Sequence, residues 1–236
     1  RVSWEREYML RIIPDEDQVI DKDWVKFYSE LPEKTETNEY IGSFISVDLA
    51  ISLKASADYT AIVILHVYGF KPEDRKYYVD KRFANKRLTH LSTLDTITSL
   101  YHSLESEDCQ ELRALVESVQ YQAAVVEQLE ERGIRSKGIK IHTDKRARLQ
   151  LASSLFEQSK VLFPDDRSMA PIIQQLVGFG IEKHDDLADA ISMGLNYLQA
   201  HLVYEVYVSF YGSLDRDTES TKSHHIYLIR STDDKA

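Results

Sequence analysis

The segment His184–Ile191, with the sequence HDDLADAI, opens an otherwise apolar stretch that runs to Leu198. In a helix, Asp189 would share a face with Asp186 and with Asp185, because residues three and four apart are neighbours on the helix surface. Acids at a helix start can simply complement the helix dipole. Asp189, however, lies one turn further in among small and apolar neighbours, where a carboxylate needs a counter-charge. A divalent cation would supply that charge.

The bulk composition limits what kind of protein carries this segment. The chain has 236 residues, 43% of them hydrophobic, which is enough for one sizeable domain with a real core. Its net charge of −10 argues against a nonspecific nucleic-acid coat, but it allows an enzyme that holds metal ions on acids and contacts phosphate through a local basic patch. Cys109 is the single cysteine, so an internal disulfide is excluded and a reducing, intracellular setting fits.

The ends of the sequence carry little targeting information. No apolar run approaches the ~18 residues of a membrane-spanning helix, and no secretory signal pattern opens the chain. We therefore expect no membrane partner and no secretion. The first residue is Arg1 rather than Met, which would fit a piece of a longer protein.

The pattern of apolar residues predicts three sequential strands, followed by alternating helices and strands. The expected strands are 43–50, 59–68, 76–83, 112–117, 139–142 and 161–164, and the expected helices are 89–104, 120–132, 145–158, 171–178 and 186–200. Short connections between the first three strands indicate an antiparallel meander. The order as a whole predicts an α/β fold with a mixed central sheet, antiparallel first and parallel later, flanked by helices.

The chain divides into three parts on this pattern. Residues 1–38 are charged and irregular, which is typical either of an arm or linker beside another domain or of an N-terminal extension of the same domain. Residues 39–200 hold the predicted α/β domain. Residues 201–236 form a C-terminal extension in which 203–211 and 226–230 could pair as a β-hairpin.

Two further acids end predicted strands: Asp48 ends the first strand and Glu117 ends the fourth. Residues at strand ends tend to project into the crevice where open α/β sheets bind ligands. If the helix that starts at Asp186 docks beside these strands, all the acids converge. Carboxylates are the hard oxygen ligands that suit Mg²⁺ or Mn²⁺, and no Cys or His cluster competes to make a zinc site.

Each acid also has an ordinary structural explanation. Asp48 could be a turn or cap residue, and Glu117 could be a solvated strand end. Asp185 and Asp186 could be N-cap and first-turn acids, and His184 could be a plain loop residue. Their joint placement, at the positions where a metal-binding α/β fold needs acids, weakens these explanations.

Four motifs, in order, resemble the RNase H-like nuclease superfamily, and most closely the nuclease domain of the large terminase subunit of tailed bacteriophages. They are FISVDLA (44–50) followed by ADYTAI (57–62), VESVQYQ (116–122), KRARL (145–149) leading to VLFP (161–164), and HDDLADA (184–190). The resemblance covers roughly residues 40 to 200. Resolvases of the same superfamily share the last motif, whereas the Asp-Tyr-Thr sequence at 58–60 and the basic helix favour terminase.

The resemblance implies a metal-dependent DNA endonuclease that cuts concatemeric viral DNA during genome packaging, in the cytoplasm of the host cell. It implies that Asp48, Glu117 and Asp189 are catalytic metal ligands. Asp185 and Asp186 join them as further candidate ligands, for two Mg²⁺ or Mn²⁺ ions in all. Asp58 and His184 would lie around those ligands. The implied partners are double-stranded DNA, the packaging ATPase, the small terminase subunit and the portal.

Contacts to DNA would come from local basic residues. The densest group beside the predicted site is Lys140, Lys145, Arg146 and Arg148. A second group, between Lys81 and Arg87, fits a solvated face better. Such contacts reach phosphates, so they predict little sequence specificity.

Other functions remain open on the sequence. The chain has no Gly-x-x-x-x-Gly-Lys-Ser/Thr loop, so it is not itself an ATPase motor. That absence also argues against a sugar-kinase-like fragment. The alternatives are another RNase H-like nuclease, such as a junction resolvase or a transposase core, and a non-catalytic DNA-packaging interaction module.

Overall fold

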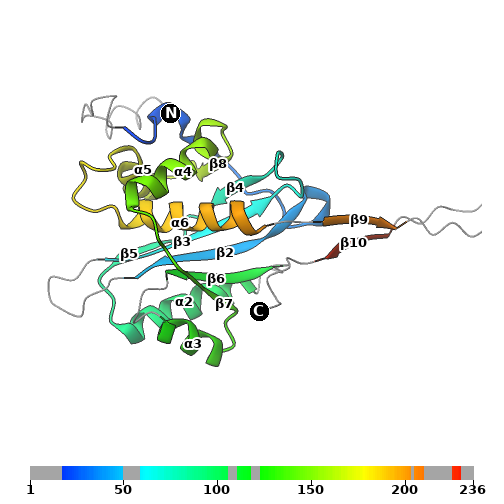
Figure 1. Cartoon of the computed structure of the whole chain (residues 1–236), viewed down its shortest axis with the longest axis horizontal. Coiled ribbons are helices and arrows are strands. Elements are labelled where there is room, and N and C mark those ends of the chain that lie inside the picture. Colours follow the sequence, from blue (N-terminus) through cyan, green and yellow to red (C-terminus); the bar gives the residue numbers. More distant parts are fainter. Residues whose placement is uncertain are drawn as a thin grey trace, which may run out of the picture.

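The computed structural model describes residues 18–49, 59–105, 111–117 and 123–202, together with the backbone of 205–209 and 225–229. The described chain forms a central sheet with helices on both faces (Figure 1). The strands are β1 (Lys26–Tyr28), β2 (Tyr40–Asp48), β3 (Thr60–Tyr68), β4 (Lys76–Val79), β5 (Ala84–Lys86), β6 (Leu112–Glu117), β7 (Ser136–Ile139), β8 (Val161–Pro164), β9 (Glu205–Ser209) and β10 (His225–Ile229). The helices are η1 (Lys22–Trp24), η2 (Glu36–Asn38), α2 (His90–Glu105), α3 (Ala123–Glu131), α4 (Lys145–Glu157), η3 (Arg167–Met169), α5 (Ala170–Val177) and α6 (Asp186–His201).

The main sheet is mixed, with strand order β1-β8-β4-β3-β2-β6-β7 and β5 paired to β3. The first long strands, β2, β3 and β4, run antiparallel to their neighbours in sequence. The later strands add in parallel: β6 on β2, β7 on β6 and β8 on β4. The predicted fold class, a mixed α/β sheet flanked by helices with antiparallel strands first and parallel strands later, is confirmed.

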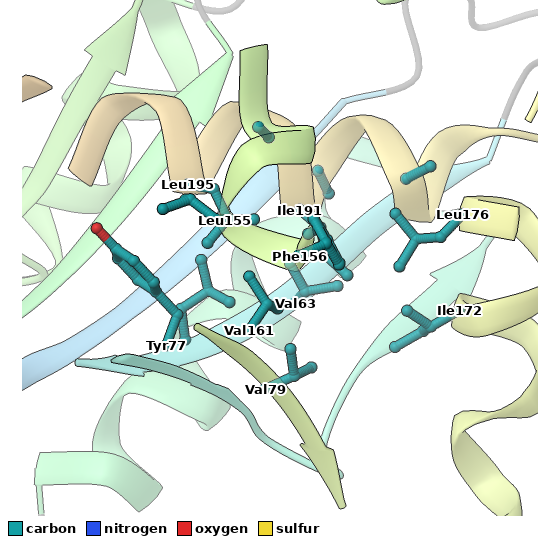
Figure 2. Packing of buried hydrophobic residues seen from close by; sticks show 14 of the residues in the cluster. Val63, Tyr77, Val79, Leu155, Phe156, Val161, Ile172, Leu176, Ile191 and Leu195 are labelled. Atoms are coloured by element: carbon teal, nitrogen blue, oxygen red, sulfur yellow. The ribbon is translucent and has the colours of Figure 1, made fainter. Parts of the chain in front are cut away.

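Alternation along the central strands sends side chains into two separate cores. One core lies under α4, α5 and α6, and Figure 2 shows Leu155, Phe156, Ile191 and Leu195 from those helices packing over Val63 of β3. The other core lies under α2 and α3 on the opposite face of the sheet. Because β2 and β3 are covered on both faces, nearly all of their residues are buried, as their continuous apolar runs predict.

The C-terminal helix α6 packs directly on β2. The Ser46 hydroxyl of β2 donates a hydrogen bond to the Ala190 carbonyl of α6 at 2.6 Å. One turn later, Gly194 lies so close to the sheet that a Cβ on it would be 2.9 Å from both Leu65 Cδ1 and Ser46 Oγ. This close approach fixes the position of α6 along β2 and places the first turn of the helix beside the end of the strand.

Two predicted strands differ in the structure. The strand expected over 76–83 stops at Val79, because Asp80 turns inward to bond with His66 and to accept the backbone N–H of Arg82, and the chain rejoins the sheet as β5. The strand expected over 139–142 lies three residues earlier, as β7, since Ser136–Ile139 is the stretch that pairs with β6. In the described part of the segment 1–38, β1 pairs in parallel with β8 and Ile20 is buried in the core, which fits the alternative of an N-terminal extension of the same domain.

The remaining strands, β9 and β10, pair antiparallel with each other in a second, two-stranded sheet. Within the part of the chain that the structure describes, none of the helices has the length and apolar character required to cross a bilayer.

Replacing Gly194 with Val should reduce the free energy of unfolding by about 1–3 kcal/mol, because the added side chain would press on Leu65 and Ser46. Ala200→Val, on an exposed position of the same helix, controls for the helix propensity of valine and should cost less than about 1 kcal/mol. Urea unfolding of both variants measures the difference. Equal losses would show that the close contact of α6 with β2 contributes nothing.

Candidate active site

Asp48 and Glu117 come together because their strands are parallel neighbours. In the β2–β6 ladder, Val47 lies opposite Val116, so the next residue on each strand is an acid. Both valines face the core under α2 and α3. Strand alternation therefore directs both acids to the other face, toward α6. The two carboxyl groups interact there, since Glu117 contributes to the raised pKa of Asp48.

The third group of acids lies at the start of α6. Asp186 and Asp189 are only 7% and 1% exposed. Asp185 is the N-cap residue, but its side chain makes no capping hydrogen bond. Instead, the amide oxygen of Gln175, from α5, accepts the Leu187 backbone N–H at 2.7 Å. Helix capping therefore does not explain the three aspartates, and their carboxylates are available for other interactions.

Two cations from α4 contact these aspartates. Lys145 Nζ donates a hydrogen bond to Asp185 Oδ1 at 2.7 Å. It also forms an ion pair with Asp189 Oδ2 at 2.6 Å, although the angles there do not make a hydrogen bond. Arg148 donates from a terminal guanidinium nitrogen to Asp189 Oδ1 at 2.6 Å. Asp144 caps α4 by accepting the Ala147 N–H, which fixes the first turn that carries Lys145.

The acids strongly perturb one another. Burial, followed by the hydrogen bond and negative charge of Glu117, raises the pKa of Asp48 to about 10, and Asp189 adds to the effect. Burial also raises the pKa of Asp186 and of Asp189, although Lys145 and Arg148 partly offset it for Asp189. Burial lowers the pKa of Lys145, but its contacts with Asp185 and Asp189 outweigh this and raise it. Clustered carboxyls with raised pKa values in a cleft are typical of functional sites.

A cleft of about 420 Å³ opens over these groups. Asp48 and Glu117 line it from the sheet, Lys145 and Arg148 from α4, and Asp185 and Asp186 from α6. At its wall, the Tyr59 ring packs edge-on against His184 with ring centroids 4.7 Å apart, and the Arg87 guanidinium lies 5.5 Å from the centre of the Tyr59 ring.

The donor set fits a divalent cation. The side chains are carboxylates from two strands and one helix, which are the ligands that Mg²⁺ and Mn²⁺ prefer. The buried Asp186 Oδ2 has no hydrogen-bond partner among the described residues, and His184 Nδ1 is 3.8 Å away. Across those residues, no three Asp, Glu, His or Cys side chains are grouped to hold an ion as they stand. Lys145 and Arg148 hold Asp189 instead.

The structure places the predicted residues in different surroundings. It brings Asp48, Glu117, Asp185, Asp186 and His184 to one cleft, with Asp189 buried behind it. Asp58 lies outside the described residues.

The residues predicted to contact DNA also differ in their exposure. Lys140 is exposed and Arg146 is partly buried, whereas Arg148 is buried against Asp189 and does not present its guanidinium to a phosphate.

Sequence reasoning missed two contributors to the site. Gln175 holds the start of α6 through its hydrogen bond with the Leu187 N–H, and Tyr59 contacts His184. Gln175 is one of two adjacent glutamines on a helix whose other residues are apolar, and this was the available signal. Tyr59 belongs to the Asp-Tyr-Thr sequence at 58–60, but that motif did not indicate that its ring lines the cleft against His184.

A mixed sheet with two acids at neighbouring strand ends, facing an acidic helix start, defines the RNase H-like class of α/β proteins. Residues 45–198 match the family described as "Terminase RNaseH-like domain", and the chain belongs to that family. No match was found among curated proteins.

Solved structures share the fold at low sequence identity. The large terminase nuclease from thermophilic phage G20c with bound magnesium has a TM-score of 0.53 at 15% identity, over 78% of this chain and 98% of that chain. The same phage nuclease with bound cobalt has a TM-score of 0.53 at 14% identity, over 78% and 98%. The human cytomegalovirus terminase nuclease domain, Mn soaked and inhibitor bound, has a TM-score of 0.56 at 17% identity, over 77% and 95%.

The metal-free protein should become less stable as the pH rises from ~4 toward ~10. Over that range the unfolded chain has released the Asp48 proton, whereas the folded chain retains it, so the raised pKa favours unfolding as pH increases. Asp48→Asn should flatten this dependence and stabilise the protein most at the alkaline end. Thermal unfolding in EDTA between pH 5 and pH 9 provides the measurement.

The control for this experiment is Asp165→Asn, at an exposed position outside the cleft. It should leave the pH dependence of the melting temperature as in the wild type. If Asp48→Asn and Asp165→Asn give the same slope, the proton on Asp48 is not coupled to folding.

Proposed function

We propose that this chain is the nuclease domain of a large terminase subunit, a metal-dependent endonuclease that cleaves concatemeric viral DNA during genome packaging. The observation that carries the proposal is the arrangement of Asp48, Glu117 and Asp189. These acids come from two neighbouring strands and a helix far away in the sequence. Asp48 and Glu117 line one cleft, and the charge of the buried Asp189 acts on Asp48. A structural explanation of each acid alone does not account for this convergence.

The proposed ligands of the catalytic ions are Asp48, Glu117 and Asp189, with Asp185 and Asp186 beside them. Divalent cations bound by such groups supply an activated water and stabilise the leaving oxygen of a phosphodiester. Similar folds contain bound magnesium in the phage G20c nuclease and were soaked with manganese in the cytomegalovirus domain. We propose Mg²⁺ or Mn²⁺ here, with two ions.

The chain's own residues hold this site in shape. Arg148, buried, orients the Asp189 carboxylate through a 2.6 Å hydrogen bond. Gln175 holds the first turn of α6 in place, and His184 lies between Tyr59 and Asp186. Such surrounding contacts are what keep metal ligands oriented in proteins.

DNA is the proposed substrate, bound through phosphate contacts at the rim of the cleft. Lys140 is exposed at the end of β7, and Arg146 lies on the first turn of α4 beside Lys145. The net charge of −10 means that binding by the chain alone should be weak. We propose that a packaging ATPase domain, a small terminase subunit and a portal compensate for this by delivering DNA, inside an infected cell.

Asp48→Asn should abolish cleavage of plasmid DNA in Mg²⁺ or Mn²⁺. The amide cannot carry the negative charge of a metal ligand, and removing one such electrostatic group costs at least about a hundredfold in rate. Gel assays of supercoiled plasmid measure the loss, and circular dichroism checks that the variant is folded.

Asp165→Asn is the matched control, since it makes the same chemical change on the surface outside the cleft. It should cleave at the wild-type rate. Undiminished cleavage by Asp48→Asn would contradict the proposal. Cleavage confined to four-way junctions, with linear duplex left intact, would indicate a resolvase instead.

Replacing both Lys140 and Arg146 with Ala should weaken DNA binding and flatten its dependence on salt. Each lost phosphate contact should reduce the slope of log K against log salt concentration by about 0.9. Fluorescence anisotropy with a duplex in Ca²⁺ measures binding without cleavage. As a control, Lys71 and Lys76, exposed near the opposite end of the sheet, should have no effect when replaced by Ala. An unchanged slope for the first pair would place the DNA contacts elsewhere.

A further inference from the structure

The Lys145 ammonium lies between two of the proposed metal ligands, Asp185 and Asp189. It is 2.7 Å from Asp185 Oδ1 and 2.6 Å from Asp189 Oδ2. Mg²⁺ binds carboxylate oxygens at about 2.0–2.1 Å, so an ion held by these carboxylates would need the space that the ammonium now fills. The ammonium and the ion cannot both occupy that space, and their positive charges would repel each other.

Asp189 can bind an ion only if one of its present partners leaves. Its Oδ1 accepts from Arg148 and its Oδ2 contacts Lys145. The Arg148 side chain is 7% exposed, whereas that of Lys145 is 51% exposed. Lys145 also has a flexible stem that reaches solvent directly, so its ammonium can move into water without becoming a buried, unpaired cation. Arg148 would leave a buried guanidinium without a partner, at much greater cost.

We propose that Lys145 is a built-in surrogate cation that balances Asp185 and Asp189 in the metal-free chain and is displaced when a divalent ion binds. This inference rests on the proposed function, because it concerns the same acids. Lys145 acts as a positioning residue: it keeps the carboxylates together before metal arrives. It also lowers the apparent affinity for metal, because every binding event must first displace it.

The remaining acids explain why a divalent ion would win this competition. The buried Asp186 Oδ2 has no hydrogen-bond partner among the described residues, and an ammonium held by Asp185 and Asp189 does not satisfy it. Asp48 and Glu117 face each other as two acids, and the positive charge of Lys145 offsets only a small part of what burial and Glu117 do to Asp48. A doubly charged ion could also bind these oxygens. The displaced ammonium would stay attached to the start of α4 at the wall of the cleft, where a DNA phosphate could accept a hydrogen bond from it.

The test compares Lys145→Gln with the wild type by Mn²⁺ titration calorimetry and by thermal unfolding in EDTA. Lys145→Gln should bind Mn²⁺ about tenfold more tightly, the scale of one charge-assisted hydrogen bond that no longer has to be broken. In EDTA the same variant should melt at a lower temperature than the wild type. Tighter binding together with lower metal-free stability is the signature of a surrogate cation.

Lys183→Gln is the matched control. Lys183 lines the same cleft and is exposed. Its removal changes the charge of the cleft equally, so a general electrostatic effect would move both variants alike. We expect less than a twofold change for Lys183→Gln. Equal gains in Mn²⁺ affinity for the two variants, or an unchanged metal-free melting temperature for Lys145→Gln, would overturn the proposal.

A measurement on the wild-type chain covers the case in which Lys145→Gln does not fold. In ¹⁵N-lysine-labelled protein, the Lys145 ammonium resonance can be identified by its absence in Lys145→Arg. It should be protected from exchange with water in EDTA and lose that protection on addition of Mg²⁺. Protection that persists at saturating Mg²⁺ would overturn the proposal.

The two proposals can fail separately. If the wild type binds no Mn²⁺, both the nuclease proposal and the surrogate-cation proposal fall. If it binds Mn²⁺ and Lys145→Gln binds no more tightly than Lys183→Gln, only the role of Lys145 is wrong. If Lys145 behaves as proposed but the wild type cuts no DNA, only the nuclease activity is wrong.

Discussion

The contact of α6 with β2 is the constraint on which the site depends. The Ser46–Ala190 hydrogen bond and the close approach at Gly194 fix the position of the helix along the strand. Because Asp48 lies two residues beyond Ser46, and Asp189 precedes Ala190, the same contact places strand-end acid beside helix acid. The apolar face of the helix stabilises the fold, and its polar first turn carries the chemistry.

Charge balance is the second constraint, and it explains why α4 belongs to the site. Asp186 and Asp189 are taken almost completely out of water, which is costly for carboxylates unless cations accompany them. Lys145 and Arg148 lie three residues apart on α4, so both face α6 and meet Asp189 together. One cation is buried and the other reaches solvent. This asymmetry gives the site one fixed counter-charge and one that can be exchanged.

Much of the architecture could be predicted from the sequence, because the long apolar runs and the helical periodicities are strong local signals. The strand ends at Asp48 and Glu117 and the start of α6 at Asp186 all follow from such patterns. Local patterns failed where a distant partner decides the conformation. Asp80 ends β4 because it bonds with His66 on the neighbouring strand β3, and β7 begins at Ser136 because β6 sets its register. Likewise, the sequence marked Arg148 as basic, but only the packing of α4 on α6 turns it toward Asp189 rather than toward DNA.

The central claim is that Asp48, Glu117 and Asp189, remote from one another in the sequence, form one divalent-cation site. Anomalous diffraction from Mn²⁺-soaked crystals of this chain tests it most directly, because the ion itself scatters. We predict a manganese peak coordinated by carboxylate oxygens from both strands and from α6. A well-diffracting soaked crystal without manganese between these carboxylates, or with manganese bound only elsewhere, would contradict it.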